Sequence, residues 1–228
     1  MFVIGTVAGP RDSRLVEWAR HWKNRGQLLV IVQATPDWLD GELAQQVYAA
    51  APEIEIVPAL PAGNADLHWN SLMTIATQYR PEATITCKGT DEFMDEAAWK
   101  QLKTLVRQDP KAAVFWVSYR DYFDGQFFKE LDAGPDYHPI VVRGVPLWYP
   151  TKFHTWPSPK CGPEAVEYLP DTIFIEHRRS LVDVIRSNRQ RESYASSQEI
   201  QVQRQFIERL KKVCENRSIE WPEEQPHE

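Results

Sequence analysis

Two adjacent carboxylates follow a strand-like segment near the middle of the chain. The stretch TITCKGTDEFM, residues 84–94, alternates Thr with Ile and Cys before it ends in Lys-Gly-Thr-Asp-Glu-Phe. Hard cations such as Mg²⁺ and Mn²⁺ bind carboxylate and phosphate oxygens together, so Asp91, with Glu92 beside it, is a candidate ligand for a metal-bound diphosphate. An acidic pair is also common where a helix begins, because the helix dipole favours negative charge there. Composition alone favours this second interpretation.

Four further candidates follow other segments. His177 ends TIFIEH and is a candidate second metal ligand, although a lone His is more often structural. Arg178 opens a series of Arg residues that either neutralises a diphosphate or forms a solvated helix face. Asp37 in QATPDW either accepts hydrogen bonds from a base or ribose, or completes a Pro-Asp turn. Asn64 in PAGN is a phosphate contact or, on spacing alone, a helix cap.

Several common catalytic motifs are absent. The segment GTVAGPRDS is not G-x-G-x-x-G, because Gly5 and Gly9 are four residues apart and Pro10 follows. The chain has no G-K-[ST] sequence and no nucleophile elbow around a Ser. These absences argue against a Rossmann dehydrogenase, a P-loop NTPase and an α/β-hydrolase.

The elements that would position the candidates alternate along the first 120 residues. Apolar segments predict strands, and segments with apolar residues at i, i+3, i+4 and i+7 predict helices. The predicted strands are 2–7, 27–33, 53–59, 83–89 and 112–123, with helices within 12–26, 63–79 and 95–109. The order β-α-β-β-α-β-α-β indicates an α/β fold, a three-layer sandwich around a mostly parallel central sheet.

Ligands bind such sheets at the carboxyl ends of the strands. The segments AGPRDS, ATPDW, PAGN and KGTDEF each follow one of the first four predicted strands. They are therefore expected to surround one crevice, which brings the separate candidates together.

The rest of the chain differs in composition. Residues 134–163 interleave Pro with aromatic residues, which predicts an ordered binding loop. A last amphipathic helix is expected at 193–215, and it carries apolar residues at helical spacing, namely Phe206, Ile207, Leu210, Val213 and Cys214. The acidic tail, 216–228, is predicted to be disordered.

Overall composition narrows the function classes. The net charge of −6 argues against a wide grip on duplex nucleic acid, although residues 178–212 hold nine Lys/Arg against four Asp/Glu. No apolar run approaches the roughly 20 residues of a membrane span, so no transmembrane segment is expected. The N-terminus is typical of a first strand rather than a signal peptide. Three widely separated Cys residues argue against a disulfide framework and a zinc site and favour a cytoplasmic protein.

The pattern resembles GT-A glycosyltransferases, in particular the inverting family 2-like group with an Asp-x-Asp-Glu-Phe signature. The matching segments are TVAGPRDSRLVEWARHWKNRG, LLVIVQATPD, GNADLHWNSL, KGTDEFM and IFIEHRRS. They run from about residue 2 to about residue 191. The resemblance implies a Rossmann-type GT-A-like domain at 1–192, with 134–163 on the acceptor side and the C-terminal helix added to it.

The resemblance also implies a nucleotide-diphosphate sugar donor, most often a UDP-sugar, bound with Mn²⁺ or Mg²⁺. Asp91 matches the motif's second Asp, which contacts metal and diphosphate, and His177 matches a late His that completes the metal site. Gly89 stands where the motif has its first Asp. The remaining donor-side positions implied by the resemblance are Thr6, Ala8, Gly9 and Asp37. Asn64, Lys88, Thr90 and Arg178 are donor-side candidates from their own positions in the sequence.

The catalytic base and the acceptor stay open at this stage. The family's base is a carboxylate after the motif strand, and Asp136, Glu164 and Glu167 are available, none within a motif that assigns the role. A saccharide, lipid-linked or protein acceptor ranks above a modified base in DNA because of the net charge. A non-catalytic module that binds nucleotide sugars is the alternative, motivated by Gly89 and the unassigned base.

Overall fold

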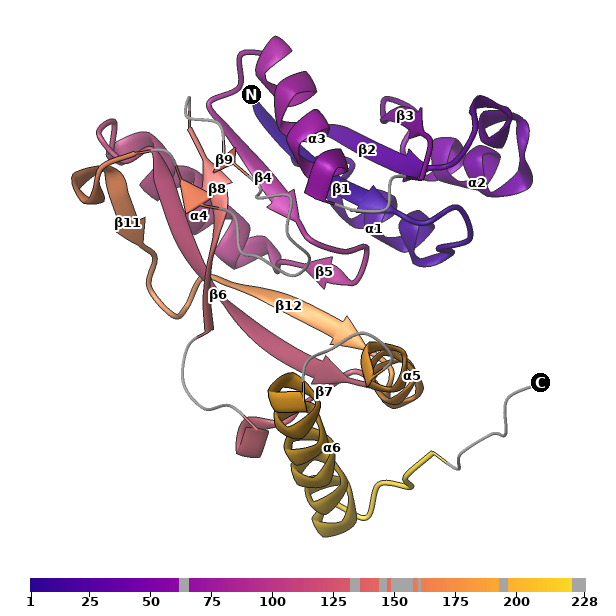
Figure 1. Cartoon of the computed structure of the whole chain (residues 1–228). Coiled ribbons are helices and arrows are strands. Elements are labelled where there is room, and N and C mark those ends of the chain that lie inside the picture. The colour runs from indigo at the N-terminus through magenta and orange to yellow at the C-terminus, as the bar shows by residue number, and fades with distance from the viewer. Residues whose placement is uncertain are drawn as a thin grey trace. The chain divides into compact units, whose positions relative to one another are not determined.

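A computed structural model describes residues 1–61, 66–131, 136–143, 147–148, 158–159, 161–192 and 197–222 (Figure 1). The chain forms two compact units. The first consists of Met1–Tyr119 and Asp136–Ile175, and the second of Arg120–Pro135 and Glu176–Glu228. Two long strands begin in the first unit and continue into the second.

The first unit holds most of the regular structure. Its helices are α1 (Arg14–Trp22), η1 (Pro36–Asp40), α2 (Glu42–Ala50), α3 (Asp66–Gln78), α4 (Glu96–Gln108) and η3 (Pro163–Ala165). Its strands are β1 (Phe2–Ala8), β2 (Gln27–Gln33), β3 (Glu55–Ala59), β4 (Ala83–Cys87), β5 (Glu92–Phe93), β8 (Asp136–Val142), β9 (Leu147–Trp148), β10 (Ser158–Pro159) and β11 (Val166–Tyr168), with the first parts of β6 (Val114–Phe123) and β12 (Phe174–Arg179).

The central sheet has the order β3-β2-β1-β4-β8-β6. Strand β1 lies between β2 and β4 and pairs with both in parallel. Strand β3 is parallel to β2, whereas β8 is antiparallel to both β4 and β6. The α/β class with a mostly parallel sheet is therefore confirmed, and the strand order reverses direction between β1 and β4.

Helices cover both faces of this sheet because β1 is apolar on both sides. Ile4 of β1 belongs to a core cluster with Trp18 of α1, Val47 of α2 and Trp99 of α4. Val3, the neighbouring residue, packs instead in a second cluster with residues of α3, namely Trp69, Leu72, Met73 and Ala76. Alternate residues of one strand thus contact opposite helical layers, which confirms the three-layer arrangement.

Helix α2 was missing from the sequence-based order of elements. Its buried residues are Ala44, Val47 and Ala50, which are spaced three apart. Two of these side chains are the methyl groups of Ala, so the apolar periodicity of the sequence is weak, although this face of α2 is buried.

The prediction of a single loop for residues 134–163 was also wrong in part. Residues 136–142 form β8, which lies inside the sheet between β4 and β6. Pro139 cannot donate a ladder hydrogen bond, and β8 accommodates it through a register shift, because Val141 pairs with Phe115 but Pro139 pairs with Trp116. Residues 132–135, 144–146, 149–157 and 160 lie outside the described residues.

Composition alone had favoured a helix start at Asp91 and Glu92, but this acidic pair does not begin a helix. Glu92 lies in β5, and α4 begins only at Glu96. The cap of α4 is Asp95, whose carboxylate accepts a hydrogen bond of 2.6 Å from the backbone N–H of Ala98.

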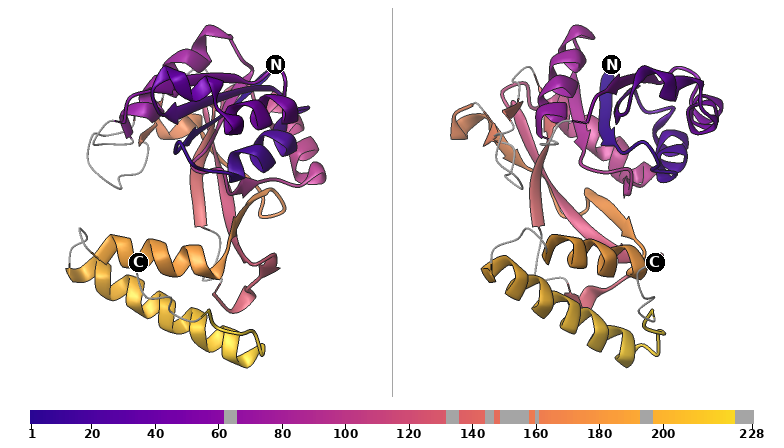
Figure 2. Two further views of the ribbon diagram at one scale, coloured as in Figure 1. Left: turned by 90° about the vertical axis from the view of Figure 1, so that its right-hand side faces the viewer. Right: turned by 45° about the vertical axis from the view of Figure 1, so that its right-hand side comes forward.

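The second unit is built from the ends of β6 and β12 with β7 (Gln126–Phe127), η2 (Lys129–Leu131), α5 (Leu181–Glu192) and α6 (Ser197–Asn216). Helices α5 and α6 lie side by side (Figure 2). The expected C-terminal helix is present, and its predicted apolar residues, Phe206, Ile207, Leu210, Val213 and Cys214, pack in the core cluster of this unit. Ile219 and Trp221, in the predicted tail, pack against the same cluster.

Among the described residues, no helix has both the length and the apolar character needed to cross a membrane.

The close pairing of β1 and β2 makes Gly26 sensitive to substitution. A Cβ at this position would lie 2.5 Å from the backbone oxygen of Phe2, which cannot move without disturbing β1. We expect Gly26→Ala to lower the free energy of unfolding in chemical denaturation by about 1–3 kcal/mol. Gly9→Ala is the matched control, since its Cβ would meet nothing within 4 Å. Equal stability of the two variants would contradict this packing argument.

Candidate functional site

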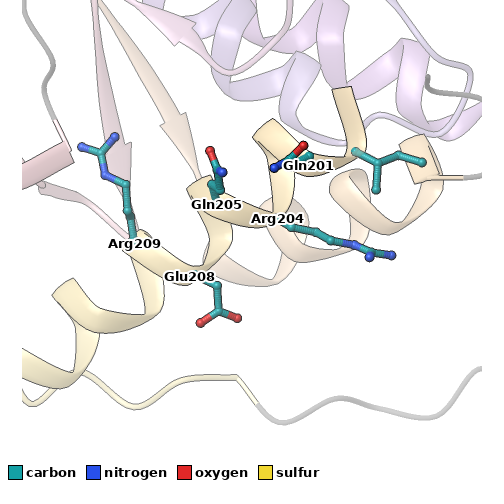
Figure 3. Close-up of a pocket in the computed structure, with 6 residues that line it drawn as sticks. Gln201, Arg204, Gln205, Glu208 and Arg209 are labelled. Atoms are coloured by element: carbon teal, nitrogen blue, oxygen red, sulfur yellow. The ribbon is translucent and has the colours of Figure 1, made fainter. Parts of the chain in front are cut away.

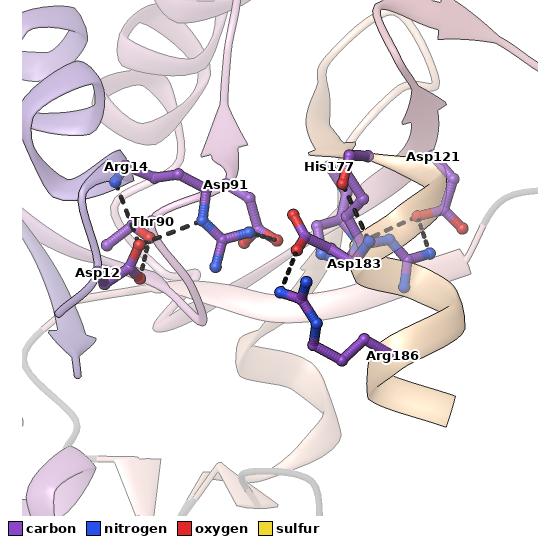
Figure 4. Close-up of polar contacts among 10 residues, drawn as sticks. Asp12, Arg14, Thr90, Asp91, Asp121, His177, Asp183 and Arg186 are labelled. Carbon is purple, nitrogen blue, oxygen red and sulfur yellow. Dashed lines mark hydrogen bonds and ion pairs between the residues drawn. The ribbon is translucent and has the colours of Figure 1, made fainter. Parts of the chain in front are cut away.

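A group of polar side chains joins the loops that follow β1 and β4. Asp12 lies between β1 and α1, and its Oδ1 accepts hydrogen bonds from the backbone N–H and the Nε of Arg14, both at 3.2 Å. Its Oδ2 accepts the hydroxyl proton of Thr90 at 2.5 Å, and Arg14 Nη1 lies 3.4 Å from Asp91 Oδ2 (Figure 4). Because β1 and β4 are parallel neighbours, these four residues, here called the switch-point cluster, lie where the strand order reverses.

The glycine of the Lys-Gly-Thr-Asp-Glu-Phe motif has a local cause. A Cβ on Gly89 would lie 2.3 Å from Asp91 Oδ1, so the Asp91 carboxylate folds back over the space that a side chain at 89 would fill. An Asp at this position would displace Asp91 from its contact with Arg14. Gly89 and the Arg14–Asp91 pair therefore depend on each other.

The metal site that the sequence predicts from Asp91 and His177 stays a prediction. Arg14 places a positive charge between the carboxylates of Asp12 and Asp91. Among the described residues, no three or more His, Cys, Asp and Glu side chains gather as a metal site would require. His177 belongs to the other unit, where its Nδ1 contacts Asp121 Oδ1 at 3.0 Å.

A second set of titratable groups lies on the other side of β4, toward β8. Lys88 Nζ is 3.0 Å from His138 Nδ1, and His138 Nε2 is 2.9 Å from Asp136 Oδ2. An ammonium group can only donate, so Nδ1 accepts and Nε2–H donates to Asp136. We call Lys88, His138 and Asp136 the amine–imidazole–carboxylate chain. It leads from a half-buried amine through a buried ring to a carboxylate whose side chain is 72% exposed.

Burial lowers the pKa of Lys88 to about 8, and the charges of Glu92 and Asp136 oppose this shift. Glu92 is 2% exposed, and one of its oxygens accepts hydrogen bonds from the backbone N–H of Lys88 at 2.7 Å and from the hydroxyl of Tyr119 at 2.8 Å. The buried carboxylate therefore both fixes the start of the loop after β4 and stabilises the ammonium.

Strand register separates two of the predicted catalytic candidates, Asp136 and Glu164. Asp136 pairs with Tyr119 in the middle of β6, whereas Val142 pairs with Val114 at its start and with Thr84 near the start of β4. Asp136 thus lies at the end of the sheet where β4 runs into Lys88. Glu164 belongs to η3, just before β11 pairs its Val166 with Val114, so it lies at the opposite end.

The other predicted donor positions are placed as follows. Thr6 is fully buried, and its hydroxyl has no hydrogen-bond partner among the described residues. Ala8 is buried, while Gly9 has open space beside its backbone. Asp37 is exposed on η1, which is tied to the β1 loop by a 2.8 Å hydrogen bond from Trp38 Nε1 to the Pro10 carbonyl. Asn64 lies outside the described residues.

The predicted residues of the second unit are held by their neighbours. Arg178 donates two hydrogen bonds to Glu176, at 2.9 and 2.6 Å. Asp121 contacts both His177 and Arg179 (Figure 4). Burial opposes the ionisation of Asp121, but the hydrogen bond with His177 and the charge of Arg179 outweigh it and lower its pKa.

A hollow of about 520 Å³ lies along α6 (Figure 3). Its lining residues all belong to that helix and are Ile200, Gln201, Arg204, Gln205, Glu208 and Arg209. None of the predicted site residues contributes to it, so the chemistry of the strand ends lies elsewhere.

Sequence reasoning missed the partners that organise both polar sets. Asp12 was recognised only as a possible helix cap, and Arg14, Tyr119, His138 and Asp121 were not singled out. The position of Asp12 directly after a strand was a usable signal. No local signal identifies His138, because its partner Lys88 is 50 residues away.

Comparison with known proteins gives distant structural likenesses. No family model matches the chain, and no curated protein matches it. It is similar to residues 1–349 of TarS from S. aureus in complex with UDP, with 12% identity, a TM-score of 0.49 and coverage of 93% of this chain and 72% of that one. A second structure of this TarS fragment gives 10% identity, a TM-score of 0.47 and coverage of 95% and 72%.

A 4-diphosphocytidyl-2C-methyl-D-erythritol synthase is similar at 12% identity and a TM-score of 0.39, over 63% of this chain and 75% of that one. Likenesses at these TM-scores do not establish a family or an activity. The function is therefore argued from the residues and the site.

The electrostatic role of Glu92 can be tested directly. Its charge favours the ammonium form of Lys88, so Glu92→Gln is expected to lower the pKa of Lys88 below about 8. The measurement is an NMR titration of the Lys88 side chain. Glu96→Gln is the control, because Glu96 is exposed at the start of α4 and pairs instead with Arg25 and Lys100. A Lys88 pKa that rises in Glu92→Gln would refute this account.

Proposed function

We propose that the chain is a glycosyltransferase that uses a nucleotide-diphosphate sugar, most often a UDP-sugar, held at the carboxyl ends of β1, β2 and β4. The observation that supports this most is the switch-point cluster. Open α/β sheets bind ligands where the strand order reverses, outside the carboxyl ends of the strands. In this sheet that place lies between β1 and β4, and the sequence supplies charged side chains there from both loops.

The basic side chains of the loop after β1 can contact a diphosphate directly. Asp12 and Asp91 orient the guanidinium of Arg14, whose side chain is 45% exposed, and Arg11 is exposed on the same loop. The loop leads into the N-terminus of α1, where the helix dipole favours an anion. Open space beside Gly9 lets a ligand approach the backbone. The Mn²⁺ or Mg²⁺ expected from the resemblance stays a prediction.

The transfer of a sugar is supported by the resemblance of KGTDEFM and IFIEHRRS to the family 2-like group, and by the amine–imidazole–carboxylate chain beside the motif. We place the acceptor on the β8 side of β4, because the donor is placed on the β1 side. A saccharide, lipid-linked or protein acceptor fits the net charge of −6 better than nucleic acid does.

Isothermal calorimetry with UDP and UDP-sugars, with and without Mn²⁺, tests donor binding. We expect Gly9→Phe to fold but to bind UDP at least about tenfold more weakly, roughly 1.4 kcal/mol, because the ring fills the open space beside the end of β1. Ala97→Phe, on an exposed position of α4, is the control for adding an aromatic ring.

Unchanged affinity in Gly9→Phe would overturn the proposed location, and no binding of any nucleotide or nucleotide sugar would overturn the function. Binding that requires Mn²⁺ would support the metal expected from the resemblance, whereas equal binding without it would assign the charge on the diphosphate side to Arg14 and Arg11. Tight binding without release of UDP, to water or to any acceptor tried, would favour the alternative of a binding module without transfer activity.

A further inference from the structure

Resting on the proposed function, we propose that Asp136 is the catalytic base that accepts the proton of the attacking hydroxyl, and that Lys88, acting through His138, is a positioning residue for it. The sequence left the base unassigned among several carboxylates. The register of β8 now places one of them, and not Glu164, at the end of the sheet that carries the motif loop.

The exposure of the three groups sets their roles. The Asp136 side chain is 72% exposed, so a substrate hydroxyl can reach it, whereas the His138 side chain is 5% exposed. A surface carboxylate on a strand end normally samples several rotamers. The 2.9 Å contact with a buried ring restricts Asp136 to one orientation, which is what a base must have when it meets a bound acceptor.

The polarity of the hydrogen bonds gives Lys88 its role. The ammonium donates to His138 Nδ1, and this keeps the ring proton on Nε2, where it is donated to Asp136. A neutral Lys88 amine can still donate to Nδ1, and the Asp136 carboxylate itself favours the proton on Nε2, so the ring keeps this tautomer when Lys88 loses its proton. Lys88 therefore holds the ring, and through it Asp136, by its hydrogen bond rather than by its charge.

The proposed step is a direct displacement. The acceptor oxygen forms a bond to the anomeric carbon while its proton passes to the Asp136 carboxylate. The bond between the anomeric carbon and the diphosphate oxygen breaks, and its electron pair leaves with the nucleotide diphosphate. Asp136 then returns the proton to solvent, so the charges of Lys88 and His138 are the same before and after turnover.

The pH dependence distinguishes this role from a rival one. The groups that face Lys88 are Glu92 from β5, Tyr119 from β6, and His138 and Asp136 from β8. The pKa of Lys88 is about 8, and turnover is expected to stay level as the pH rises through that value, because the neutral amine still donates to His138. If Lys88 were itself the base, turnover would rise over the same range, because the neutral amine would be the active form.

The experiment measures release of UDP from a UDP-sugar with water as acceptor, between pH 6 and pH 10, alongside calorimetric binding of UDP. Asp136→Asn should reduce turnover by about 10²–10⁴-fold and leave UDP affinity unchanged. Lys88→Met should reduce turnover, because the ring loses the donor to Nδ1, whereas Lys88→Arg should retain it, because a guanidinium still donates. Glu53→Gln, an exposed carboxylate outside the proposed site, is the control for removing a charge.

A readout independent of turnover is the ¹⁵N spectrum of His138. We expect the Nε2–H tautomer on both sides of pH 8. Full turnover in Asp136→Asn or in Lys88→Met, loss in Glu164→Gln instead, a rate that rises through pH 8, or an Nδ1–H tautomer would each overturn the proposal while leaving donor binding intact. A chain that binds UDP-sugar but never releases UDP would also overturn it, whereas failure to bind any nucleotide would remove the proposed function itself.

Discussion

The parallel pairing of β1 with β4 determines what the site can be. Thr6 lies opposite Cys87 in this pairing, so the chain leaves both strands at the same edge and the two following loops must meet. Each loop is short and polar, and its charged side chains contact those of its neighbour. The hydrogen bond from Thr90 to Asp12 and the contact between Arg14 and Asp91 are direct consequences of that register. A shift of the register would separate Asp12 and Arg14 from Thr90 and Asp91.

Gly89 is best understood as a consequence of the same contact. Its missing side chain leaves room for the Asp91 carboxylate, which reaches Arg14 from there. The carboxylate placed in this way contacts the Arg14 guanidinium, which has a fixed charge at any accessible pH. Gly89, Asp91 and Arg14 therefore form one arrangement.

Largely continuous apolar segments made β1 and β2 readable from the sequence, because strands buried on both faces have no polar side. The alternation of Thr with Ile and Cys made β4 readable. Helix α2 and strand β8 were not readable, since Ala44 and Ala50 give a weak periodicity and Pro139 signals a loop. Single members of the site, such as Asp91, Lys88 and Asp136, were found from their positions after strands or after the motif. Their partners were not, because Thr90 and Asp12 are 78 residues apart and only the sheet register brings them together.

Carboxylates pair with a cationic side chain on each side of strand β4, and the two pairings differ in how far they are buried. On the β1 side the Arg14 side chain is 45% exposed, so solvent weakens each contact and the group stays charged throughout the physiological range. On the β8 side Lys88 is desolvated, and its charge depends on Glu92 and Asp136. A diphosphate needs constant positive charge, whereas a base needs a fixed orientation, which a buried hydrogen-bonded chain supplies. The difference in burial across one strand therefore suits the donor to the β1 side and the acceptor to the β8 side.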